Sequence, residues 1–360
     1  MRIANRTIQF LFSLSLLILP LMASASGGHS ESADKEFSAT ELINSHIGDA
    51  HEFHIADWNG HSISLPLPII LWTDNGLDIF SASEFHHDNT GHHVAKDKFV
   101  RYNEVIFYAD KFETLKEEDK SAFNFGARPL DFSITKNVFS MLMSVIILLI
   151  LFITVARSYK KNSMAPKGLA GFLEPLVIFV RDDIAIPNIG EKKYRKFMGY
   201  LLTVFFLIWL LNLLGMTPLG INVTGNISVT ICLALFTYFI TQFSANKDYW
   251  KHIFWMPGVP VPMKIILMPI EILGTLTKPF ALLIRLFANI TAGHVVIMSL
   301  IAMIFVGKNL ATDLPISLGL TLFISIIEVL VAFLQAFIFT MLSSLFIGMA
   351  VQDHHHDDNH

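Results

Sequence analysis

The stretch from Pro279 to Gly307 reads PFALLIRLFANITAGHVVIMSLIAMIFVG, and Arg285 is the one Asp, Glu, Lys or Arg among its 29 residues. A helix of this length extends about 43 Å, whereas the hydrocarbon core of a bilayer is about 30 Å thick. A second stretch, Leu314 to Gln352, has Glu328 as its one such residue in 39 positions, and as a helix it extends about 58 Å. We therefore predict two long, tilted transmembrane helices that form a hairpin.

The rest of the chain agrees with a membrane protein. Of its 360 residues 53% are hydrophobic and only 16% are charged, and the mean hydropathy is +0.53. The segment Asn137 to Ala156 has no Asp, Glu, Lys or Arg, and neither does Phe197 to Asn246, which Gly, Pro and Asn residues interrupt in its middle. The prediction is an all-α polytopic membrane protein with five transmembrane helices. The net charge of -4 gives no reason to expect nucleic acid as a partner.

The N-terminal third has a different character. Arg2 and Arg6 precede the apolar run Ile8 to Met22, which ends in the small residues Ala23, Ser24 and Ala25. This pattern predicts a signal peptide over residues 1–25, and the alternative is an uncleaved first membrane helix. Residues 26–136 have the composition of a small exported domain with short β-rich segments. Residues 137–352 form the transmembrane domain, and residues 353–360 form a tail.

The distribution of basic residues predicts the orientation. Nine Lys and Arg residues lie between Arg157 and Lys196, whereas the loop after Gly215 has none and the loop after Gly307 has only Lys308. By the positive-inside rule the basic loop is cytoplasmic, so the N-terminal domain is periplasmic and the C-terminus is cytoplasmic. Within the basic loop, Leu169 to Ile184 mixes apolar and charged residues, which predicts an interfacial helix on the cytoplasmic membrane surface.

Polar residues fall at two levels of the predicted hairpin. In an antiparallel arrangement His294 lies at the height of Glu328, and Arg285 lies deeper, at the height of Gln335. Asn289 follows Arg285 by four residues and shares its helix face. Charged groups at this depth are unfavourable unless they face a cavity or a partner, so they mark ion paths. A carboxylate and an imidazole at one level can exchange a proton near neutral pH, which predicts a proton relay.

Each of these residues also has a structural alternative. For Arg285 it is snorkelling to an interface, and for His294 it is a hydrogen-bonded buried histidine. Asn289 and Gln335 have an alternative role as interhelical hydrogen-bonding residues. A further alternative is an independent proton-coupled secondary transporter, although such proteins usually contain an internal repeat and this sequence shows none.

A metal site is a third alternative, because the exported segment is rich in histidine. The single cysteine, Cys232, does not support a metal site, and the Asn, Thr and Gly residues among the histidines indicate a loop. The histidines concerned are His51, His54, His61, His86, His87, His92 and His93.

Two motifs resemble a known family. TKPFALLIRLFANITAGHVV (Thr277 to Val296) and EVLVAFLQAFIFTML (Glu328 to Leu342) resemble the signature hairpin of subunit a of the F-type ATP synthase. NLLGMTP (Asn212 to Pro218) and FVRDDIA (Phe179 to Ala185) are also similar to that family, and the resemblance covers roughly Thr135 to Val351. It implies a bacterial inner-membrane, non-catalytic subunit that needs no cofactor and conducts protons through two half-channels. The implied partners are the c-subunit ring, the b subunits of the peripheral stalk and, indirectly, the catalytic sector.

The resemblance also implies roles for particular residues. Arg285 corresponds to the essential arginine that faces the c ring. Some members carry Glu on the arginine helix and His on the next, whereas here the two types are exchanged as His294 and Glu328. Some members carry Asp within the segment that holds Asn212 and Gly215, and its absence puts an acidic uptake residue there in doubt. We include Asn212, Asn289 and Gln335 among the candidate proton-path residues.

Overall fold

The structure is a computed structural model that describes residues 48–58, 61–87, 93–96, 98–102, 104–115, 126–161, 168–217, 221–256, 259–306 and 310–352. The predicted signal peptide and the tail 353–360 lie outside these residues. The chain divides into two compact units, Met1–Leu142 with Leu214–Asn222, and Met143–Leu213 with Val223–His360. Each unit is described by itself below.

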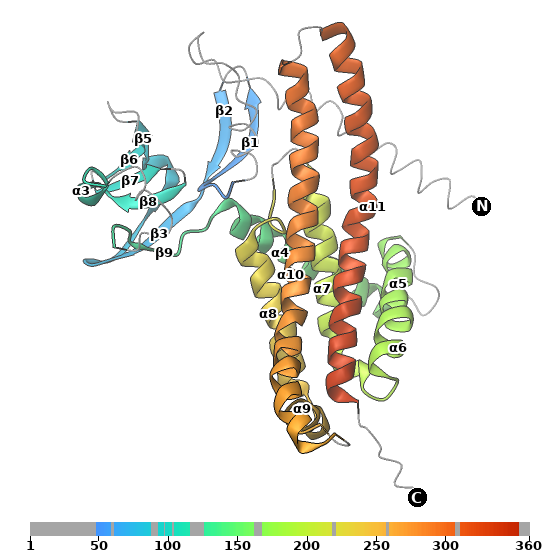
Figure 1. Cartoon of the computed structure of the whole chain (residues 1–360). Coiled ribbons are helices and arrows are strands. Elements are labelled where there is room, and N and C mark those ends of the chain that lie inside the picture. Colours follow the sequence, from blue (N-terminus) through green and yellow to red (C-terminus); the bar gives the residue numbers. More distant parts are fainter. Residues whose placement is uncertain are drawn as a thin grey trace, which may run out of the picture. The chain divides into compact units, whose positions relative to one another are not determined.

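Within the described part of the first unit the strands form three antiparallel sheets (Figure 1). Ile69 and Leu71 alternate along β3 (Pro68–Thr73), the central strand of the second sheet described below. They pack with Phe80, Phe99 and Ile106 in a common core. One sheet pairs β1 (Glu52–Trp58) with β2 (His61–Pro66). A second has the order β4 (Gly76–Ser81), β3 (Pro68–Thr73), β9 (Leu130–Asp131). The third has the order β5 (His86–His87), β6 (His93–Ala95), β7 (Phe99–Tyr102), β8 (Val105–Tyr108), and the short helices η1 (Ala82–Glu84) and α3 (Ala109–Phe112) connect or follow these strands.

The first long helix, α4 (Lys136–Lys161), starts directly from this β-rich unit. The carboxylate of Asp49 accepts hydrogen bonds from the backbone N–H of Asn137 at 3.0 Å and from the hydroxyl of Thr135 at 3.0 Å. The N–H of Lys136 donates to the carbonyl of Ala50 at 2.8 Å. Because the first N–H groups of a helix have no partner within the helix, these contacts fix where α4 begins.

Among the described residues, five helices are long and apolar enough to cross a membrane. They are α4, α7 (Tyr194–Gly215), α8 (Ile227–Ser244), α10 (Val261–Val306) and α11 (Leu310–Val351). This confirms the predicted polytopic helical class with five membrane helices. The shorter helical segments are α5 (Leu169–Phe179), the π-helical turn η3 (Val180–Ala185), α6 (Ile186–Ile189) and α9 (Lys247–Phe254).

The predicted boundaries of the hairpin were wrong at two points. Helix α10 begins at Val261 instead of Pro279 and has 46 residues, which is about 69 Å of helix. Helix α11 begins at Leu310 instead of Leu314. The prediction began α10 at a proline that follows charged residues, but interior prolines are tolerated in membrane helices when neighbouring groups replace the lost backbone bond. The three charged residues before Pro279 recur every seven positions and so share one side of the helix: Lys264, Glu271 and Lys278.

Helix α11 packs against α10 along the hairpin (Figure 1), and it also contacts α6, α8 and η3. The ring of Phe179, the last residue of α5, packs at a tilt against Phe333 and Phe337 of α11, with ring centroids 6.2 and 5.6 Å apart. Near Gly348 the backbones approach so closely that a Cβ on this glycine would overlap the carbonyl of Asn188. The Asn188 amide also donates to the Ser344 hydroxyl at 2.9 Å. The segment predicted to be interfacial therefore has α11 as a packing partner.

The C-terminal end of α11 is held by side chains from two other segments. The ammonium of Lys193 donates to the carbonyl of Val351 at 2.6 Å, and the amide of Asn246 donates to the same carbonyl at 2.8 Å. The backbone N–H of Asn246 donates to Ala350 at 2.9 Å. These bonds satisfy the carbonyls that a helix end leaves without a partner.

Candidate functional site

The carboxylate of Glu328 lies directly against the backbone of α10 at Gly293. A Cβ on Gly293 would lie 3.2 Å from the carboxyl carbon of Glu328 and would overlap its Oε1. His294 is the next residue and is half-buried, as is Glu328. The carboxylate thus reaches α10 within one residue of the height expected for the acid–base pair, and a glycine is what permits this approach.

From the predicted proton relay of His294 and Glu328, we expect Gly293→Ala to lower proton flux several-fold, while the complex that the family resemblance implies still assembles. The added methyl group meets the free end of a flexible side chain, so the Glu328 carboxylate moves and the backbone does not. Proton flux through vesicles that contain the assembled complex measures the effect. Gly274→Ala on the same helix is the matched control, because a Cβ at Gly274 would have no atom within 4 Å. Equal flux in both variants would contradict a role for the position of this carboxylate.

Arg285 and Asn289 lie together on the exposed side of α10, whereas Leu282 and Leu286 of the same turns are buried. Within the part of the chain that the structure describes, Arg285 forms no ion pair. Its neighbour Ile284 is also exposed. A guanidinium among exposed apolar side chains, at the depth of a membrane helix, is unfavourable unless another molecule covers it.

Asn212 and Gln335 are buried, so the structure separates them from the exposed face that carries Arg285. The amide nitrogen of Asn212 donates to the carbonyl of Ala332 in α11 at 3.4 Å, a long bond, and its oxygen accepts from the Thr224 hydroxyl at 2.8 Å. Asn212 therefore links α7 to α11 one helical turn beyond Glu328. These contacts support an interhelical role for Asn212.

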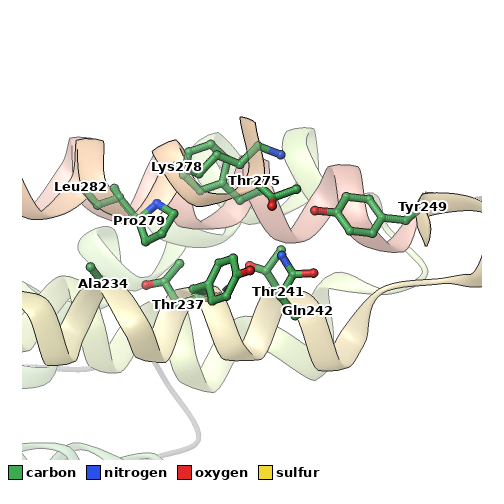
Figure 2. Close-up of a pocket in the computed structure, with 11 residues that line it drawn as sticks. Ala234, Thr237, Thr241, Gln242, Tyr249, Thr275, Lys278, Pro279 and Leu282 are labelled. Carbon is green, nitrogen blue, oxygen red and sulfur yellow. Dashed lines mark hydrogen bonds between the residues drawn. The ribbon is translucent and has the colours of Figure 1, made fainter. Parts of the chain in front are cut away.

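A second polar region lies between α8, α9 and α10, beside Phe346 of α11 (Figure 2). In Figure 2 the residues of α8 face those of α10 across a narrow pocket, with Tyr249 of α9 at one end. Lys278 precedes Arg285 by seven residues, or about two turns and 10 Å along α10. Its ammonium lies 5.9 Å from the Tyr249 ring and 5.5 Å from the Phe346 ring. The polar side chains that line this pocket are Thr237, Tyr238, Thr241, Gln242, Tyr249, Thr275 and Lys278.

The sequence interpretation missed this pocket. Thr237 and Thr241 are four residues apart and therefore share one face of α8. This spacing could have predicted a polar face on that helix. The sequence interpretation began the arginine helix at Pro279, so Lys278 lay outside the predicted helix. Recognising the continuous helix would have placed Lys278 on the arginine helix itself.

In the first unit a buried histidine lies between two carboxylates. His51 Nδ1 lies 3.2 Å from Glu104 Oε2, and His51 Nε2 lies 3.5 Å from Asp131 Oδ2, an ion-pair distance that is long for a hydrogen bond. Burial by itself lowers the pKa of His51, but Asp131 and Glu104 together raise that pKa to about 9. Among the described residues no group of three metal-ligand side chains occurs. His51 is thus a cation paired with carboxylates.

The pH dependence of this unit follows from that pairing. Because the folded-state pKa of His51 is raised, its contribution to stability is complete below pH 6.5 and is lost as the pH rises towards 9. We expect the unfolding temperature of this unit, measured by calorimetry on the full chain, to fall between these pH values. The variant His51→Gln should lack the dependence in this window, and a wild-type profile in that variant would contradict the assignment.

Comparison with known proteins gives two matches along the chain. The family described as "ATP synthase A chain" matches residues 138–348, more than half of the sequence. Residues 42–132 match a family described as "Domain of unknown function (DUF8433)". The matched families thus divide the chain into an N-terminal part and a membrane part.

Curated relatives agree with the first match. The chain is 48% identical over 237 residues to "ATP synthase subunit a 2" of Chlorobaculum tepidum, a match that covers 64% of this chain and 66% of the relative. It is 49% identical over 234 residues to "ATP synthase subunit a" of Chlorobium phaeobacteroides (strain BS1), covering 63% and 68%. It is 48% identical over 235 residues to the protein of the same name from Chloroherpeton thalassium, covering 63% and 69%. The match spans about two thirds of the length of these relatives.

Proposed function

The chain belongs to the ATP synthase A chain family, and on that basis we propose that it is the stationary, non-catalytic subunit that carries protons to and from a rotating ring of c subunits. The observation that carries the proposal is the exposed guanidinium of Arg285 on a membrane helix. Family membership lends no support to the alternative of an independent secondary transporter.

Arg285 faces the carboxylates of the c ring in this proposal. An ionised carboxylate on a ring subunit supplies the partner that Arg285 lacks among the described residues of its own chain. The guanidinium lowers the pKa of that carboxylate by stabilising its ionised form, so the proton leaves. Because an arginine stays protonated, it cannot pass the proton onward and it separates the two half-channels.

The periplasmic half-channel passes Glu328 and His294. Support comes from the contact of the Glu328 carboxylate with Gly293, beside His294, and from the partial exposure of both side chains. Glu328 takes up a proton and His294 exchanges it, after which a ring carboxylate becomes neutral and moves into lipid. Asn289 contributes a polar group on the face of Arg285, whereas the buried Gln335 contributes one inside the helix packing. Asn212 holds α7 against α11 one turn beyond Glu328.

The cytoplasmic half-channel passes the pocket of Figure 2. Its polar side chains lie on α8, α9 and α10, and Lys278 is two turns nearer than Arg285 to the N-terminal end of α10. Under the predicted orientation this end is cytoplasmic. Protons released beside Arg285 leave along these hydroxyl and amide groups.

The topology and partners follow from the same proposal. The chain is a multi-pass protein of the bacterial inner membrane in this proposal, which its five membrane-competent helices and its family support. We propose a cleaved signal peptide at residues 1–25, a periplasmic domain at 26–136, a transmembrane domain at 137–352 and a cytoplasmic tail at 353–360. The segment Leu169 to Ile184 lies at the cytoplasmic interface. The partners are the c ring, the b subunits of the peripheral stalk and, indirectly, the catalytic sector.

An exchange of the acid and the base tests the proposed relay. His294→Glu alone leaves two acids at one level, and Glu328→His alone leaves two imidazoles, so we expect both to lower ATP-driven acidification of inverted vesicles. The double variant restores one acid and one base, and it should recover more pumping than either single variant at equal amounts of assembled complex. If the double variant pumped protons no better than the single variants, the proposed relay between residues 294 and 328 would be contradicted.

A further inference from the structure

The sheet formed by β4, β3 and β9 is apolar on both of its faces. Ile69, Leu71 and Phe80 point into the core of the unit and are buried. On the opposite face, Trp72 pairs with Leu77 on one side and Leu130 on the other, and Ile70 pairs with Ile79. The N–H of Phe132 donates to the carbonyl of Ile70 at 2.9 Å, so Phe132 continues this second row.

This outer face therefore has two rows of three apolar side chains across three strands, and we refer to these six residues as the outer apolar face. Five of them are between 54% and 64% exposed: Trp72, Leu77, Ile79, Leu130 and Phe132. A sheet with one face in water normally alternates apolar and polar residues along each strand. An exposed cluster of large apolar residues indicates a surface that another molecule covers.

The chain leads from this face into the membrane without a loose connection. Beyond β9 the N–H of Ile134 donates to the carbonyl of Pro68 at 3.1 Å, and the Ser133 hydroxyl accepts from the N–H of Ile70 at 3.1 Å. The membrane helix α4 then begins at Lys136, where Asp49 and Ala50 bond its first turn. Phe132 precedes Lys136 by four residues, so the connection spans at most about 14 Å.

The chemistry of the face and its surroundings matches a membrane interface. Tryptophan concentrates at the level of lipid headgroups, and interfacial elements bury their apolar side about 5–10 Å into the boundary. Trp72 and Leu130 also line a hollow with one acidic residue, Asp74, and two basic residues, Lys111 and Arg128. Basic side chains beside an apolar face suit contact with headgroup phosphates.

We propose that the outer apolar face rests on the lipid bilayer, at the membrane surface where α4 enters. The N-terminal domain is then a membrane-lying domain, which orients the start of α4 through the sheet as well as through the chain itself. The lipids supply apolar contact to the six side chains and phosphate groups to Lys111 and Arg128.

Fluorescence quenching in the assembled complex tests this inference. In a Cys232→Ala background, which removes the single native cysteine, Ile79→Cys is labelled with an environment-sensitive fluorophore. The complex is reconstituted into vesicles of phosphatidylcholine and phosphatidylglycerol. Leu77→Cys serves as a second variant on the same face, and Ser83→Cys is the control at an exposed position of η1.

Labels at positions 79 and 77 should be quenched by lipids brominated near the headgroup and should be shielded several-fold from aqueous iodide relative to position 83. Quenching by iodide equal to that at position 83 would mean that the face stays in water and would overturn the proposal. Shielding from both quenchers would mean that a protein covers the face, either a second copy or another subunit, and would overturn it as well.

Discussion

Replacing Arg285 with alanine is expected to abolish ATP-driven proton pumping while leaving the complex assembled. The side chain is exposed on α10 and forms no ion pair among the described residues, so its removal breaks no ion pair there. In the proposed function the substitution removes the positive charge that lets a ring carboxylate ionise at this depth. It would also remove the proposed barrier between the two half-channels, so passive proton leak should rise.

Acidification of inverted membrane vesicles on addition of ATP measures the first effect, and decay of an imposed pH gradient measures the second. Ile284→Ala is the matched control, since it shortens an exposed neighbouring side chain without changing charge. Pumping should be near that of the wild type in the control and absent in Arg285→Ala at equal amounts of complex. Unchanged pumping in Arg285→Ala would refute the role of this residue and bring back the transporter class.

Glu328→Gln is expected to slow proton uptake by about 100-fold, the typical contribution of a positioned proton-transfer group. Glutamine nearly preserves the shape of the side chain against Gly293, so packing between α10 and α11 should be retained. What is lost is a group that can gain and lose a proton. Gln335→Asn, on the same face of α11 and buried, should have a smaller effect because neither amide titrates.

The initial rate of ATP synthesis under an imposed proton gradient distinguishes these two variants. A large loss in Glu328→Gln together with a mild loss in Gln335→Asn supports uptake through the acid–base level. Equal and mild losses would show that the outer polar level serves packing only, and the Gly293→Ala result would then be expected to be mild as well.

The helical class and the five membrane crossings were predictable because apolar length and the absence of charge are strong signals. It was also possible to predict that His294 and Glu328 lie at a similar height, because antiparallel helices of equal rise keep their register along a hairpin. The contact of Glu328 with Gly293 was not predicted, because the approach of two backbones depends on packing along the whole interface. The roles of the six candidate residues remain proposals.

Other features depended on tertiary contacts that no local pattern contains. The extension of α10 to Val261 passes two prolines, and local preference alone argues for a break at each. The pocket around Lys278 joins residues of α8, α9, α10 and α11, which are adjacent only after folding. His51 was considered as part of a histidine-rich segment, whereas its partners are distant in the sequence: Glu104 directly precedes β8, and Asp131 ends β9.

The bonds at the end of α11 have a mechanical consequence. In the proposed function, a rotating ring exerts a tangential force on the helices that face it, and the C-terminal end of α11 has to be held against that force. The carbonyls of Ala350 and Val351 are bound by Asn246 and Lys193, and α6 abuts the backbone at Gly348. Force on α11 would therefore be transmitted through these bonds to Lys193, just before α7, and to Asn246, just after α8. These two segments would then resist movement of the hairpin.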